Sequence, residues 1–166
     1  PNVLGYVHVE DLTKIRDPKT DKVIKDVNPK MHYGVIGIGK TTYKENRTEQ
    51  WEELGFKLGK LIHPTSYVDP RAKIEEGSSV WPLAFIDGDS IIGKSSMIGP
   101  QSAIHYGKLG DYCHLGIQVK ILPGSKIENH AFIGSGTTIL ENILIGERSV
   151  VGPNSTVNRN IPDQHS

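Results

Sequence analysis

The sequence has little cysteine, few aromatic residues and no net charge. Cys113 is the single cysteine among 166 residues, which excludes an internal disulfide framework and fits a reducing compartment. Basic and acidic residues number 19 each, so no charge excess indicates nucleic acid or a membrane surface as a partner. No apolar run is long enough to span a membrane, and the N-terminus lacks the layout of a signal peptide. We therefore expect one cytoplasmic domain with, at most, a small appendage.

A six-residue repeat dominates the second part of the chain. Counting in sixes from Val68, and again from Leu109, always reaches Ile, Leu or Val. The positions are Val68, Ile74, Val80, Ile86, Ile92, Ile98, Ile104, Leu109, Leu115, Ile121, Ile127, Ile133, Ile139, Ile145, Val151 and Val157. A period of six fits neither a helix nor simple alternation, but it fits short strands joined by tight corners that stack into a shared core. With three sides per coil, these positions predict a parallel β-helix of about five coils.

The repeat has one register defect. The step from Ile104 to Leu109 is five residues, and the missing residue falls within His105-Tyr106-Gly107. Such a defect is either a shortened corner that the solenoid tolerates or a corner reshaped to aim a side chain.

Residues 1–62 have a different pattern and predict a small β–β–α–β appendage to the solenoid of residues 63–166. Strands are expected at residues 3–9, 32–39 and 60–63, with a polar stretch after the first of them. A helix is expected at residues 48–58, with Thr48 as its N-cap and Trp51, Leu54 and Leu58 on one face.

Residues 34–41 read GVIGIGKT and match the phosphate-binding loop G-x-x-x-x-G-K-[ST]. We interpret the match as a coincidence, because VIGI is apolar enough to be the strand itself. About 60 residues also leave no room for the usual large sheet around such a loop.

The combined features resemble bacterial sugar acetyltransferases of the left-handed β-helix, hexapeptide-repeat superfamily. The resemblance is to nucleotide-linked amino-sugar N-acetyltransferases and sialic-acid O-acetyltransferases, and it covers roughly residues 5–163. HYGKLGDYCH resembles the family pattern H-[ED]-x-x-[IL]-G-[ED]-x-x-H, while GFKLGKLIHPTSYVDPRAKIEEGSSV resembles the entry into the helix. The resemblance implies a left-handed, three-sided solenoid, a homotrimer, acetyl-CoA as acetyl donor and a sugar as acceptor, and it implies no bound metal.

Acetyl transfer needs a base for the acceptor's proton and a donor for the developing oxyanion. The resemblance places His105 as the base, Tyr106 in the position of its orienting carboxylate, and His114 near the thioester. It implies coenzyme A contacts at Gly124, Gly134, Ser135 and Gly152, with Lys120, Lys126, Arg148 and Arg159 available for its phosphates. Acceptor-site positions are Glu10, Asp11, Gly39 and Lys40.

The chain departs from the family pattern in several places. The family's first strand and its glycine-rich turn are missing, and the family's G-x-P-A-K ending is missing as well. A phenol at Tyr106 orients a histidine less well than a carboxylate does. Pro123 stands near the oxyanion donor and lacks an N–H group.

Two alternatives remain open at this point. The chain is either an active enzyme or a degenerate trimeric scaffold that keeps only the fold. A zinc enzyme of the γ-carbonic anhydrase type would use His105, His114 and His130, although their spacing of 9 and 16 residues does not match that class.

Overall fold

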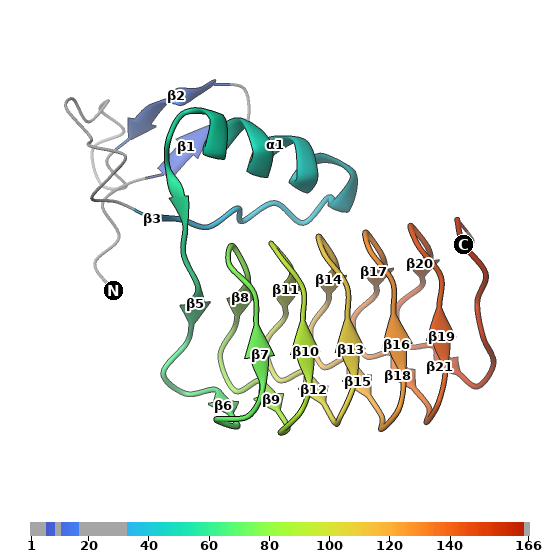
Figure 1. Cartoon of the computed structure of the whole chain (residues 1–166). Coiled ribbons are helices and arrows are strands. Elements are labelled where there is room, and N and C mark those ends of the chain that lie inside the picture. The colour runs from blue at the N-terminus through green and yellow to red at the C-terminus, as the bar shows by residue number, and fades with distance from the viewer. Residues whose placement is uncertain (1–5, 9–10, 17–32, 165–166) are drawn as a thin grey trace.

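The computed structural model describes residues 6–8, 11–16 and 33–164. Residues 61–157 form a left-handed parallel β-helix of about five coils, which runs across Figure 1 with its strands stacked in register. The predicted fold class is therefore confirmed.

Three parallel sheets form the faces of the solenoid, and each face is named here after a central strand. The β13 face contains β7 Lys73–Ile74, β10 Ile91–Ile92, β13 Lys108–Leu109, β16 Lys126–Ile127 and β19 Leu144–Ile145. The β14 face contains β5 Leu61–Ile62, β8 Ser79–Val80, β11 Met97–Ile98, β14 His114–Leu115, β17 Phe132–Ile133 and β20 Val150–Val151. The β12 face contains β6 Tyr67–Val68, β9 Phe85–Ile86, β12 Ala103–Ile104, β15 Lys120–Ile121, β18 Thr138–Ile139 and β21 Thr156–Val157.

The repeat positions form the core. Each of them is the second residue of a two-residue strand, and each stacks on its equivalent in the next coil, as Ile98 does between Val80 and Leu115. Ile86, Ile92, Ile98 and Ile104 have no exposed surface. The pattern begins one strand earlier than predicted, because Ile62 pairs with Val80.

The corners turn through one residue with a left-handed backbone. This residue normally follows the inward side chain by three positions, as Leu83 follows Val80, and its φ is 59°. The frequent glycine directly after the inward residue has a different cause. A Cβ on Gly116 would lie 2.6 Å from the backbone nitrogen of Ser135 in the next coil, so close stacking requires glycine there.

The N-terminal elements differ from the sequence prediction. β1 Tyr6–His8 pairs antiparallel with β2 Asp11–Arg16, which the sequence had suggested was only a polar stretch. β3 Tyr33–Gly34 is far shorter than the predicted strand at 32–39, and it pairs with β4 Lys57–Leu58. The strand predicted at 60–63 is confirmed as β5.

The helix prediction was wrong in its start, its end and its cap, and Leu58, which was predicted on the helix face, lies in β4. Helix α1 spans Thr41–Glu53, with Lys40 at the N-cap position, and Thr48 lies in its interior. Thr48 is polar for another reason, because its Oγ1 lies 3.1 Å from the hydroxyl oxygen of Ser95 on the β-helix. The predicted packing of Trp51 is confirmed, but Leu54 is exposed.

Helix α1 lies along the edge between the β13 and β14 faces (Figure 1). Its contacts run antiparallel to the coils. Glu45 near its start approaches His130 at 3.5 Å, and Glu52 near its end forms an ion pair with Lys94 at 2.9 Å. The buried Lys44, directly before Glu45 in α1, donates a hydrogen bond to the carbonyl oxygen of Cys113 at 2.7 Å. Neither α1 nor any other helical segment in the described part of the chain could span a membrane.

The two isoleucines of β10 test the inward stacking directly. Ile92→Ala should lower the free energy of unfolding by about 2–5 kcal/mol, because it leaves a cavity in the core. Ile91→Ala removes the same atoms from the outer surface of the same strand and should cost far less. Urea denaturation of both variants provides the measurement. Equal losses would contradict the inward assignment of Ile92.

Candidate active site

The register defect shortens the corner between the β12 and β13 faces, which we call the His105 corner (His105–Gly107). Tyr106 has a φ of 46° and follows the inward Ile104 by only two positions, so one residue is missing before the turn. Equivalent serines, such as Ser125, donate to a carbonyl oxygen in the next coil. The Ser90 hydroxyl beneath the short corner is buried and has no partner among the described residues. The defect therefore changes the local backbone.

The His105 corner presents an imidazole–carboxylate pair. His105 Nδ1 lies 2.9 Å from Oδ2 of Asp87, which occupies the same corner one coil earlier. A carboxylate at this distance fixes the proton on Nδ1 and leaves Nε2 with a free lone pair. The His105 ring also packs against Phe85, with ring centroids 5.4 Å apart.

Asp87 was missed by the sequence analysis, which sought the carboxylate beside His105 in the chain. The available signal was the coil length, because residues 18 apart lie on neighbouring coils. Tyr106, the predicted occupant of this role, is half exposed, and the hydrogen bonds of the described residues do not join it to His105. A direct role for Tyr106 remains a prediction.

His114 lies on the outer surface of the β14 face. Its ring stacks on Phe132 with centroids 4.8 Å apart, and Gly39 lies so close that an added Cβ would be 3.5 Å from Cε1 of His114. Burial and the charge of Lys44 lower the pKa of His114 to about 4, so the ring is neutral at physiological pH. His105 and His114 share none of these contacts within one chain.

The residues predicted to contact coenzyme A lie at two corners. Gly124 lies at the equivalent of the His105 corner in the next coil, and its φ is 76°. Gly134, Ser135 and Gly152 lie at the corner between the β14 and β12 faces, which we call the Gly134 corner. A Cβ on Gly134 would be 2.5 Å from the backbone nitrogen of Pro153, so coil stacking alone requires this glycine. Gly152 meets no such contact. The cofactor role of all four residues remains a prediction.

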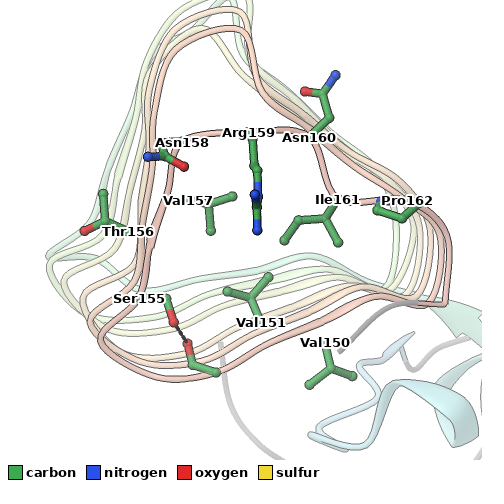
Figure 2. Close-up of a pocket in the computed structure, with 11 residues that line it drawn as sticks. Val150, Val151, Ser155, Thr156, Val157, Asn158, Arg159, Asn160, Ile161 and Pro162 are labelled. Atoms are coloured by element: carbon green, nitrogen blue, oxygen red, sulfur yellow. Dashed lines mark hydrogen bonds between the residues drawn. The ribbon is translucent and has the colours of Figure 1, made fainter.

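The four candidate cations for coenzyme A phosphates have different surroundings. Lys126 pairs with Glu128 at 2.6 Å, and Arg148 pairs with Glu147 at 3.2 Å. Arg159 points into a pocket of about 620 Å³ at the open end of the solenoid, between Val157 and Ile161 (Figure 2). Lys120 projects from the β12 face. Neither Lys120 nor Arg159 has an acidic partner within the described part of the chain, so both stay candidates for a phosphate contact.

The segment that matched a phosphate-binding loop is neither the predicted strand nor a curled loop. After β3 it runs extended beneath α1, so its N–H groups do not converge on one point (Figure 1). Gly34 is required because a Cβ there would lie 2.3 Å from the Trp51 ring. The Lys40 ammonium lies 4.6 Å from the centre of the Tyr43 ring, and Gly39 contacts His114.

The other acceptor positions are less defined. Asp11 begins β2 opposite His8, and Glu10 lies outside the described residues. Within residues 33–164, no three His, Cys, Asp or Glu side chains gather in a way that could hold a metal ion. His105, His114 and His130 in particular lie on different elements.

Comparisons with known proteins agree with the repeat and the fold described above. A family model described as bacterial transferase hexapeptide (six repeats) matches residues 106–141 and 124–159. The chain carries the bacterial-transferase hexapeptide repeat. The bifunctional protein GlmU of Carboxydothermus hydrogenoformans is 31% identical over 129 residues, which cover 78% of this chain and 25% of that protein.

Two solved structures have the same fold. A variant of perosamine N-acetyltransferase from Caulobacter crescentus, in complex with CoA and GDP-perosamine, has a TM-score of 0.76 and 29% identity. The match covers 78% of this chain and 62% of that one. WeeI from Acinetobacter baumannii has a TM-score of 0.60 and 26% identity, over 78% of this chain and 64% of its own. The hexapeptide-repeat chain thus spans only part of each relative.

Lys44 gives a prediction for stability. Burial lowers its pKa from 10.5 to about 8, so the unfolded chain binds more protons than the native chain between these pH values. The destabilisation that Lys44 causes should therefore shrink as the pH increases from 8 towards 10.5, whereas the raised pKa of Cys113 lowers stability above pH 9 in wild type and variant alike. Relative to the wild type, Lys44→Met should stabilise the protein at pH 7 by an amount on the order of 1–3 kcal/mol, and by less at pH 9.5. Urea unfolding at pH 7 and 9.5, with Lys94→Met as control, measures both effects. A large loss of stability at both pH values would contradict the prediction.

Proposed function

We propose that the protein is an acetyl-CoA-dependent N-acetyltransferase that acts on a nucleotide-linked amino sugar in the cytoplasm. The observation that carries the proposal is the His105–Asp87 pair at the shortened corner. The similarity to an enzyme solved with CoA and GDP-perosamine supports the donor and the class of acceptor. The chain spans only part of the length of its relatives, so their activity is a proposal for this protein.

The pair accounts for the chemistry of acetyl transfer. The sugar amine attacks the thioester carbonyl carbon while Nε2 of His105 accepts a proton from the nitrogen. Asp87 accepts a hydrogen bond from Nδ1–H and stabilises the imidazolium that results. The C–N bond forms and the C–S bond breaks. The His105 imidazolium gives its proton to the sulfur, so the coenzyme leaves as a thiol and His105 returns to its neutral form. In this proposal Asp87 of the neighbouring coil takes the carboxylate role that the sequence analysis had assigned to the position of Tyr106.

His114 would serve the donor half of the reaction. As a neutral ring it can donate one hydrogen bond to the thioester carbonyl oxygen, where negative charge develops. Lys120 would meet a phosphate of coenzyme A, and Gly39 and Lys40 would border the acceptor. His105 and His114 share no contact within one chain, so we infer that a complete site combines residues of two copies.

Kinetics of two variants test the base. His105→Ala should reduce turnover by roughly 10²–10⁴-fold and leave acetyl-CoA binding intact, because it removes proton transfer without touching the donor site. Asp87→Asn should also reduce turnover, because an amide cannot stabilise the imidazolium. Asp89→Asn is the control, since Asp89 pairs with Arg71 and makes no hydrogen bond to His105. The assay follows thiol release with a panel of nucleotide-linked amino sugars and calorimetry with acetyl-CoA.

The same experiment separates the enzyme from a degenerate scaffold. An intact assembly that binds no acetyl-CoA at millimolar concentration would remove the proposed function. Unchanged turnover in His105→Ala would remove only its assignment as the base.

A homotrimer would place two copies around each site. Four large apolar side chains, Tyr67, Trp81, Leu83 and Phe85, are exposed together on the β12 face and the Gly134 corner. Exposed apolar groups of this size on one surface are typical of an interface.

Light scattering tests the assembly. Leu83→Asp should lower the molar mass from that of three chains to that of one, because a carboxylate would be buried in the interface. Leu144→Asp changes an exposed leucine on the β13 face and should keep the trimer. A wild-type chain that is already monomeric would overturn the trimer proposal.

A further inference from the structure

Lys44 is a charged residue of α1 without exposed surface. Its ammonium donates a hydrogen bond to the Cys113 carbonyl oxygen at 2.7 Å, but this oxygen already accepts a hydrogen bond from the Met97 N–H at 3.0 Å. The fold therefore does not need Lys44 to satisfy that group, and burial of the charge disfavours the folded state. A buried charge that stabilises nothing nearby calls for a role in the site itself.

The role that we consider concerns His114, the residue that directly follows Cys113 in the chain. Its Nδ1 is buried and has no hydrogen-bond partner among the described residues. A Cβ built on Gly39 would lie 3.7 Å from this nitrogen, and Phe132 covers one face of the ring. The Lys44 ammonium bonds the carbonyl oxygen of Cys113, the residue directly before His114, and its charge acts on the ring. The Cys113 thiol is in the inner core, where burial raises its pKa to about 12. Lys44 is thus the charged group beside the ring.

The position of the ring proton follows from these neighbours. A neutral imidazole carries its proton on one nitrogen and a lone pair on the other. A buried N–H at Nδ1 would lack an acceptor among the described residues, and it would add a positive end to a buried site that is already in the field of the Lys44 ammonium. A lone pair at Nδ1 is favoured by that same field. The proton therefore belongs on Nε2.

We propose that Lys44 is a positioning residue whose charge holds the single proton of the His114 ring on Nε2. The consequence rests on the proposed function: Nε2–H is then always available as a donor to the thioester carbonyl oxygen. Helix α1 would in this way act on the donor site, although it lies outside the β-helix. The charge of Lys44, and not its hydrogen bond to Cys113, carries the effect.

Nitrogen NMR of histidine-labelled protein tests the first part without any substrate. In the wild type the His114 signals should show the Nε2–H form down to about pH 5, with assignment from a His114→Gln spectrum. Lys44→Met should give a mixture of the two neutral forms and move the titration towards that of an exposed histidine. Lys44→Arg should retain the wild-type signals. Lys94→Met changes another lysine at the α1 edge and should also leave them unchanged.

Calorimetry with acetyl-CoA tests the second part. Lys44→Met should weaken binding by about threefold to tenfold, because part of the population presents a lone pair to the carbonyl oxygen. His114 signals that are unchanged in Lys44→Met would overturn the proposal. If the wild type binds no acetyl-CoA but its His114 signals respond to Lys44→Met, the proposed function fails and the role of Lys44 stands.

Discussion

The stacking of each coil on the next is the constraint on which the rest of the molecule depends. Two-residue strands make too few contacts to persist alone, so every inward aliphatic side chain is buried only by its equivalents above and below. The same stacking explains why glycine follows the inward residue so often, since a side chain there would meet the next coil. Residues 17 or 18 positions apart in the sequence are therefore neighbours in the structure.

The His105 corner shows what this constraint does to a single deletion. Removing one residue cannot shift the strands, because Ile92 still pairs with Leu109 and Ile104 with Ile121. The change is confined to the corner, where the Ser90 hydroxyl is left without a partner in the described part of the chain. The rigid coils then hold Asp87 beneath His105 at hydrogen-bond distance. The shortened corner therefore gives His105 a backbone setting that the equivalent corners of the other coils do not have.

The sequence predicted the solenoid well because its signal is periodic and every position repeats the same burial. It predicted the N-terminal part poorly, because α1 has few apolar residues and is positioned by contacts with distant coils. Thr48 looks like a helix cap in isolation but bonds Ser95, and Gly34 looks like part of a phosphate-binding loop but is required by its contact with Trp51. His105 was found from its pattern. Asp87 and Lys44 were not, since each acts across a contact that the local sequence does not encode.

The two histidines of the site are consequently supported in different ways. His105 obtains its carboxylate from the β-helix itself, within a continuous rigid core. An outward residue such as His114 is only partly covered by its own sheet, where Phe132 stacks on one face of the ring. The segment around Gly39 lies near the ring as well, and its charged neighbour comes from α1. His105 is thus positioned by the repeat, whereas the surroundings of His114 depend on how the N-terminal helix packs against the β14 face.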